Sequence, residues 1–327
     1  MSRVAIFAAI PLCFGFMGSI RGQESHRVRF VSVEPGVRLE VLDWGGKGPT
    51  VILLAGFGHT AHIFDEFAPK LTGECHVYGI TRRGFGASSY PAGGYTADRL
   101  ADDVLAVLDS LQLTAPVLVG HSIAGHEMSS LGVRYPGRIA GLVYLDAADY
   151  DSRDRTNDPT VQKLRKLFPE PEPREADRKS FPALKAWWER MFRISPPEAE
   201  FRNNYEMEPG GGVGKWRGAA GVWKAMTARL GKPDYGGIRA PALAIFAVQR
   251  SARDVDPWLR TQDPVRVAAL DEAYAFGNQE RALAKKAFLS GAANRRVVEL
   301  MGANHYLFLS NEREVLREVR AFLSGVR

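Results

Sequence analysis

Cysteine is scarce in this sequence. Of the 327 residues only Cys13 and Cys75 are cysteines, and Cys13 lies in an N-terminal segment with the features of a signal peptide. Without that segment the chain has no second thiol for an internal disulfide, which excludes a fold built on a disulfide framework. Cys75 lies in an apolar, strand-like run, so we expect it to be a small core residue rather than a reactive thiol.

Long runs of a single charge are also absent. The net charge is +6 and 24% of the residues are charged, but no lysine-rich run is interleaved with aromatics, which argues against a nucleic-acid partner. Hydrophobic residues make up 45% of the chain. This is typical of a globular protein with a sizeable core and excludes a disordered one.

The first 22 residues have the layout of a secretory signal peptide. A short basic start at residues 1–3 precedes an apolar run at 4–20, and the chain becomes polar at Arg21. This layout predicts a secreted or periplasmic protein. The alternative is an uncleaved membrane anchor, since about 20 apolar residues can span a bilayer; this segment would then be the protein's membrane contact.

Strand-like and helical segments alternate along the rest of the chain. Two alternating strands are predicted at 28–33 and 37–43, continuous apolar strands at 50–55, 76–80, 117–119, 139–145, 241–247 and 296–301, and helices at 95–111, 123–135, 265–290 and 312–323. Continuous apolar runs are typical of buried parallel strands. The alternation predicts an α/β fold, with a mostly parallel sheet and helices on both faces.

Residues 149–235 interrupt this alternation. Between 151 and 200, 21 of 50 residues are charged, and four of the chain's six tryptophans (Trp187, Trp188, Trp216 and Trp223) lie in the wider stretch. Aromatics among charges predict helices with one apolar face, and the glycines at 210–212 predict a flexible joint. We therefore expect an α/β core at 23–148 and 236–327 with an inserted helical cap at 149–235.

The strongest chemical signal is Gly120-His121-Ser122-Ile123-Ala124-Gly125. It lies between a predicted strand and a predicted helix, which is the context of a nucleophile elbow. A serine in that sharp turn needs very small neighbours two residues away on each side, and Gly120 and Ala124 meet this need. Ser122 is therefore the predicted nucleophile.

A serine hydroxyl needs a base to remove its proton, and His305 is the best candidate. It follows the last predicted strand, so its loop lies on the same sheet edge as Ser122. The pair His59 and His62 could suggest a metal, but we see no carboxylate or third ligand beside them and predict no metal site. The oxyanion needs two backbone N–H donors, for which we choose Ile123 and Phe57.

Four landmarks occur in order: Leu54-Ala55-Gly56-Phe57, Arg83-Gly84-Phe85-Gly86-Ala87-Ser88, Gly120-His121-Ser122-Ile123-Ala124 and Gly302-Ala303-Asn304-His305. On these the sequence resembles the α/β-hydrolase superfamily, in its esterase and haloperoxidase-like branch, over nearly all of the mature chain. Ala55 stands where a His-Gly pair would begin, and Thr81 where an aspartate often precedes the Arg-Gly turn. Neither position belongs to the catalytic triad.

The resemblance leaves two places for the triad acid. Family members usually carry it a few residues after the strand at 243–246, but that position falls near Arg250, and Asp254 and Asp256 lie further on. Haloalkane dehalogenases of the superfamily often take it from the strand end where Asp146 stands. We favour Asp146 and keep Asp254 as the alternative.

The sequence thus predicts a serine hydrolase that cleaves a carboxylic ester of a small, largely apolar molecule through an acyl-enzyme, with Trp187 and Trp188 as candidate substrate contacts. No cofactor is expected, since Gly84-Phe85-Gly86 is a turn rather than a dinucleotide fingerprint. The same triad could serve lactone hydrolysis, carbon–carbon bond hydrolysis or perhydrolysis. A non-catalytic ligand-binding or signalling protein on this fold, or lyase chemistry, is the alternative of another class.

Overall fold

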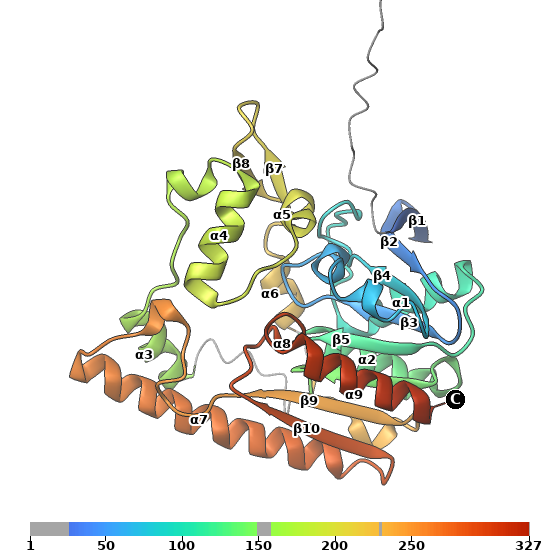
Figure 1. The fold of residues 1–327 in the computed structure, drawn as a ribbon. Coiled ribbons are helices and arrows are strands. Elements are labelled where there is room, and N and C mark those ends of the chain that lie inside the picture. Colours follow the sequence, from blue (N-terminus) through green and yellow to red (C-terminus); the bar gives the residue numbers. More distant parts are fainter. Residues whose placement is uncertain (1–25, 149–157, 229–230, 327) are drawn as a thin grey trace, which may run out of the picture.

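The computed structural model describes residues 26–148, 158–228 and 231–326 (Figure 1). The predicted signal peptide or anchor at 1–22 lies outside the described residues, as does the start of the predicted cap at 149–157. Among the helices that are described, none combines the length and the apolar character needed to cross a membrane.

A central sheet of eight strands organises the described chain (Figure 1). The strands are β1 (Arg27–Glu34), β2 (Val37–Gly45), β3 (Thr50–Leu54), β4 (His76–Ile80), β5 (Val117–His121), β6 (Gly141–Leu145), β9 (Ala242–Val248) and β10 (Arg295–Met301). Their order is β1-β2-β4-β3-β5-β6-β9-β10, antiparallel from β1 to β4 and parallel from there on. The predicted α/β class with a mostly parallel sheet is confirmed, and each predicted strand is present to within two residues.

Helices cover both faces of this sheet (Figure 1). They are α1 (Ala97–Ser110), α2 (Ala124–Arg134) and α7 (Pro264–Leu289) on one face, and η1 (Ala61–Phe64), η2 (Ala68–Lys70), α8 (Leu307–Ser310) and α9 (Glu312–Gly325) on the other. Successive residues of β3 enter opposite apolar clusters, Ile52 and Leu54 in one and Val51 and Leu53 in the other. Burial on both faces explains why this strand reads as a continuous apolar run.

The chain between β6 and β9 contains more helical than strand residues, and the inserted cap at 149–235 stays a prediction. It contains α3 (Pro159–Leu167), η5 (Glu175–Arg178), α4 (Phe181–Phe192), α5 (Glu198–Asn204), β7 (Tyr205–Met207), β8 (Val213–Trp216) and α6 (Val222–Thr227). A short 3-10 turn, η6 (Tyr235–Gly237), ends this segment, and two more occur elsewhere as η3 (Pro136–Arg138) and η7 (Pro257–Leu259). Figure 1 shows α4, α5 and the β7–β8 pair grouped together, whereas α3 lies beside α7.

The β7–β8 hairpin was not expected from the sequence. The glycines at 210–212, predicted to be a flexible joint, instead form its turn: Gly211 has φ +83°, and its N–H donates to the Glu208 carbonyl at 2.9 Å. Glycine suits this position because side chains disfavour the left-handed region. The hairpin gives this part of the cap a defined shape.

Candidate active site

Ser122 occupies the turn between β5 and α2 with φ +54°, a left-handed conformation that non-glycine residues rarely adopt. Its surroundings require small residues. A Cβ on Gly120 would lie 3.0 Å from the Ala124 Cβ, and one on Gly125 would lie 1.9 Å from the backbone oxygen of Ala147. The predicted strained turn, with tiny neighbours, is therefore what these residues form.

His305 follows β10 on the same sheet edge, and its partner comes from the end of β6. The Nδ1 of His305 lies 2.7 Å from Oδ2 of Asp146. The other carboxylate oxygen, Oδ1, accepts the Ala247 N–H at 3.0 Å, so the acid is fixed from two sides. A carboxylate at Nδ1 favours the tautomer with its proton there, which leaves the Nε2 lone pair to act as a base.

The alternative acid is engaged elsewhere. Asp254 accepts the Arg250 N–H at 3.1 Å and lies 3.6 Å from Arg193 Nη1. The neighbouring Asp256 accepts the side-chain amide of Asn304 at 3.0 Å, and burial raises the pKa of Asp256 to about 6. Of the two candidates for the triad acid, it is therefore Asp146, at the end of β6, that contacts His305.

The two predicted oxyanion donors flank the nucleophile. Gly56 packs so closely that a Cβ there would lie 3.2 Å from the Ser122 Cβ, which brings the following residue, Phe57, beside the elbow. Within the described residues, neither the Phe57 N–H nor the Ile123 N–H donates to another backbone carbonyl. Backbone donors left open beside a serine are what an oxyanion hole requires.

A buried ion pair supports this loop from behind. Arg82 contacts Glu127 at 2.8 and 2.9 Å and donates to the Ala55 carbonyl at 2.9 Å, so it joins the loop after β3 to helix α2. Sequence reasoning missed both charged residues. They lie 45 positions apart, and charged side chains are by default solvated, so no local signal marks such a pair.

The histidine before Ser122, His121, contacts the loop of the predicted base. Burial, together with the charges of His305 and His59, lowers the pKa of His121 well below 6.5, so the ring is neutral. Its Nε2 lies 3.0 Å from the backbone oxygen of His305, to which the neutral ring donates. This hydrogen bond ties the nucleophile turn to the loop of the base.

The candidate substrate contacts on α4 differ in position. Trp187 is buried in the apolar core of the cap. Trp188 is partly buried, and its ring centroid lies 6.2 Å from that of His59 and 6.4 Å from that of Tyr306. Of the two, Trp188 is therefore the one near the base, and contact with substrate stays a prediction for both.

Two further tryptophans of the cap surround the loop after β3. The Phe57 ring lies 4.7 Å from that of Trp223 and 6.4 Å from that of Trp216, centroid to centroid. Both tryptophans are exposed. Phe57, the predicted oxyanion residue, therefore lies against two aromatic rings that are themselves exposed to solvent.

The expectation that no carboxylate lies beside His59 and His62 is wrong. Glu200 lies 2.9 Å from His59 Nδ1, and Asp65 lies 3.0 Å from His62 Nδ1, with Glu40 3.5 Å from His62 Nε2. Glu200 is 141 positions away from its partner, which no sequence spacing reveals. Asp65 is close in sequence, and its position three residues after His62 was a signal that could have been used.

Among the residues that the structure describes, His26, His62 and Asp65 offer ligand atoms within 4.8 Å of one another, close enough to hold a metal ion. Burial alone would lower the pKa of His62, but the carboxylates of Asp65 and Glu40 outweigh it and raise the pKa to about 10. The imidazole is therefore protonated at neutral pH.

A cavity of about 200 Å³ adjoins the His305–Asp146 pair. It is lined by residues at the ends of β6 and β9, by His305 and by helix α7: Asp146, Ala148, Phe246, Phe276, Gly277, Glu280, Arg281, Ala284 and His305. Its walls combine apolar side chains with two carboxylates, Asp146 and Glu280, and with Arg281 and His305. It offers a small molecule space against the predicted base.

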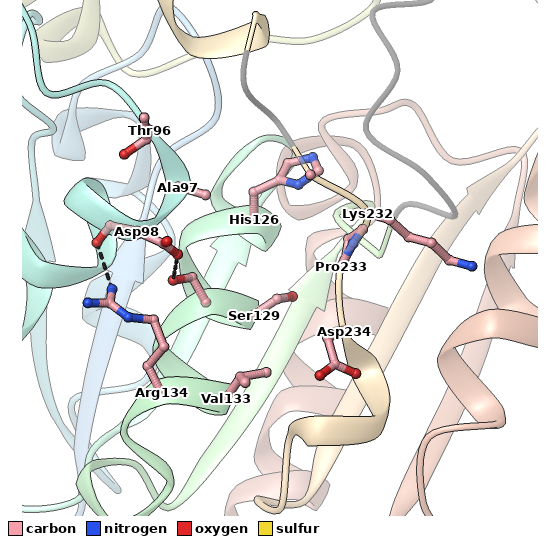
Figure 2. A pocket seen from close by; sticks show the side chains of 12 residues that line it. Thr96, Ala97, Asp98, His126, Ser129, Val133, Arg134, Lys232, Pro233 and Asp234 are labelled. Carbon is pink, nitrogen blue, oxygen red and sulfur yellow. Dashed lines mark hydrogen bonds between the residues drawn. The ribbon is translucent and has the colours of Figure 1, made fainter.

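A larger cavity of about 490 Å³ lies between α1, α2 and residues 231–234 (Figure 2). Figure 2 shows His126, Ser129 and Arg134 lining it from α2. Asp98 at its edge accepts a hydrogen bond from Ser130 and, through its backbone oxygen, one from Arg134. None of the predicted catalytic residues lines this cavity, so it is separate from the candidate active site.

Comparison with known proteins places these features in context. A family model described as "Alpha/beta hydrolase family" matches residues 51–318. The 2-(acetamidomethylene)succinate hydrolase of Mesorhizobium japonicum is 27% identical over 105 residues, which are 32% of this chain and 38% of that protein. The non-heme chloroperoxidase of Streptomyces lividans is 32% identical over 120 residues, 36% of this chain and 44% of that protein. The chain thus matches less than half the length of these relatives.

Solved structures match over a much larger share. The crystal structure of E-2-(acetamidomethylene)succinate hydrolase superposes with a TM-score of 0.65 at 19% identity, covering 91% of this chain and 99% of that one. At this identity the likeness is one of fold. The architecture is therefore shared over nearly the whole chain, including the part that the pairwise sequence matches leave out.

Proposed function

Because the chain belongs to the alpha/beta hydrolase family, we propose that it is a serine hydrolase that cleaves a carboxylic ester or a related acyl bond through an acyl-enzyme on Ser122. The observation that carries this proposal is the combination at one sheet edge of a strained serine, two open backbone N–H groups beside it, and a histidine bonded to a carboxylate. These are the parts that acyl transfer to a hydroxyl needs.

In the proposed reaction the Ser122 oxygen attacks the carbonyl carbon while His305 Nε2 takes the hydroxyl proton. The carbonyl oxygen becomes an oxyanion held by the N–H groups of Phe57 and Ile123, and Asp146 stabilises the imidazolium. Collapse of this intermediate breaks the acyl–oxygen bond, and His305 returns the proton to the leaving alcohol. His305 then activates a water molecule that attacks the acyl-enzyme and releases the acid.

The surroundings support a small, largely apolar substrate. Trp223 lies against Phe57 and Trp188 lies near His59 and Tyr306, the residue after the proposed base, and Phe246 and Phe276 line the cavity beside that base. The names of the relatives, a hydrolase of a succinate derivative and a chloroperoxidase, indicate which other acyl donors and acceptors belong in a substrate panel. Esters, lactones, amides and hydrogen peroxide as acceptor should therefore be compared.

The proposal is tested by labelling with a fluorophosphonate probe, followed by the substrate panel. Ser122→Ala should abolish labelling and lower turnover of any substrate by about 10³-fold or more, since the nucleophile is gone. The control is Ser130→Ala in helix α2, which removes a hydroxyl that donates to Asp98. It should label like wild type. Full hydrolytic activity in Ser122→Ala would refute the proposal.

A further inference from the structure

The cap side chain Glu200 is buried although it carries a carboxylate. It belongs to α5 and is 1% exposed. An ionised carboxylate in such a place is stable only when hydrogen-bond donors surround it. Four donor groups do so: His59 Nδ1 at 2.9 Å, Thr60 N at 3.1 Å, Thr60 Oγ1 at 2.5 Å and Asn204 Nδ2 at 2.5 Å.

Three of these four donors come from the loop that follows β3. Asn204, one turn further along α5, also donates to the Gly58 carbonyl at 2.7 Å. Residues 58, 59 and 60 are therefore all held by α5, immediately after Phe57, the predicted oxyanion donor. The cap fixes this loop through hydrogen bonds to a charged group, which are stronger than neutral ones.

The same network reaches the loop of the base. His59 Nε2 lies 2.8 Å from the Tyr306 hydroxyl. Glu200 lies at the other ring nitrogen, Nδ1, so the His59 ring joins the Glu200 carboxylate to the Tyr306 hydroxyl. On the other side of His305, Asn304 Nδ2 donates to the Phe192 carbonyl at the end of α4 at 3.0 Å. Both neighbours of the base are thus tied to the cap.

We propose that Glu200 is a positioning residue, through which the docked cap sets the geometry of the oxyanion loop and, by way of His59 and Tyr306, that of the base. The inference rests on the proposed function. The cap then has a part in assembling the catalytic groups in addition to covering the substrate. A small displacement of an oxyanion donor is enough to lower the rate, because the donor must meet charge that develops in the transition state.

The test compares Glu200→Gln with Glu198→Gln. Both remove one negative charge from α5, but Glu198 is exposed and pairs with Arg202 on the same helix. The readout is the kinetics of Ser122 labelling by a fluorophosphonate, separated into probe binding and the bond-forming rate constant. Glu200→Gln should lower the bond-forming rate constant by about 10- to 100-fold, with probe binding changed less than about threefold. Glu198→Gln should match wild type.

A loss of packing alone would not lower the bond-forming rate constant while leaving probe binding nearly unchanged. Once wild type hydrolyses an ester, the rate ratio between that ester and its thionoester gives a second readout, because the larger sulfur fits an oxyanion hole poorly. Glu200→Gln should lower the ratio if the loop is displaced. Should that variant fail to fold, Tyr306→Phe removes a single oxygen from the far end of the network, and it should slow labelling several-fold.

The outcomes are distinguishable. No labelling of folded wild type would overturn the proposed function and this inference with it. Labelling of wild type on Ser122, with an unchanged bond-forming rate constant in Glu200→Gln, would overturn the inference alone. If Glu200→Gln does not fold, wild-type kinetics in Tyr306→Phe would overturn it in the same way.

Discussion

Replacing Asp146 by asparagine should disable the base without disturbing the fold. Asp146 has φ +47°, a conformation that asparagine tolerates well. The asparagine oxygen can still accept the Ala247 N–H, now bonded at 3.0 Å. Its amide nitrogen then faces His305 Nδ1, which is 2.7 Å from Oδ2 in the native protein.

The magnitude follows from the tautomer. An NH₂ group in that place donates to Nδ1, so the imidazole proton moves to Nε2 and the ring can no longer accept the serine proton. The imidazolium also loses its counter-charge. The corresponding change in a Ser-His-Asp triad lowers kcat by about 10⁴-fold, which equals about 5.4 kcal/mol at 1.36 kcal/mol for each factor of ten.

The assay is turnover of the best ester of the panel, with Asp254→Asn as the matched control. Asp254 bonds to Arg250 and Arg193, so its replacement should leave kcat within a few-fold of wild type. Thermal unfolding checks that both variants are folded. Asp146→Asn with more than about a tenth of wild-type kcat, or a large loss in Asp254→Asn, would refute the assignment of the acid.

Three further predictions concern packing and pH. Gly56→Ala should lower kcat by about 10²-fold or more, because its methyl would lie 2.6 Å from Nδ1 of the buried His121. Gly93→Ala is the control, since a methyl there meets nothing within 4 Å. Equal kcat values in the two variants would contradict the reasoning. Trp188→Ala should raise KM in steady-state kinetics without changing stability, whereas Trp187→Ala should lower the free energy of unfolding in urea by about 3–5 kcal/mol. A raised KM in Trp187→Ala and a loss of stability in Trp188→Ala would show that Trp187 is the substrate contact and Trp188 the core residue. The pKa of His62 rises from 6.5 to about 10 on folding, so its stabilisation is complete below pH 6.5 and is lost as pH rises through 10. The difference in unfolding free energy between wild type and His62→Gln should therefore shrink between about pH 6 and about pH 10, and a difference that grows would contradict the ion pairing.

What the sequence could predict is what depends on neighbours along the chain. Strands β3, β4, β5, β6 and β9 were found because burial on both sheet faces produces a continuous apolar run. The elbow was found because a strained serine needs small residues at fixed offsets, here Gly120 and Ala124. Helix α1 begins after Thr96, whose side chain accepts the Arg99 N–H, close to the predicted start at residue 95. In all three cases the physical cause lies within a few residues.

What escaped prediction depends on contacts between distant segments. Glu200 reads in the sequence as one of many charges of a solvated helix, and only the fold brings it to His59. Arg82 likewise meets Glu127 only in the folded chain, where the loop after β4 reaches helix α2. The β7–β8 hairpin was missed because its strands are only three and four residues long, too short for an alternating pattern to stand out.

The triad acid could be predicted only in part, because its position depends both on neighbours along the chain and on contacts between distant segments. Asp146 and Asp254 both follow strands of one parallel sheet, so both occur at the edge where Ser122 lies, and the sequence alone could only rank them. The deciding contacts are made by neighbouring strands: the Asp146 N–H donates to the Ile245 carbonyl at 2.8 Å, and its carboxylate accepts from Ala247, two residues further along β9. The acid therefore starts on β6 but is held by β9. Because β9 supplies backbone groups rather than the carboxylate itself, the turn after it can carry Arg250 without loss of the proposed triad.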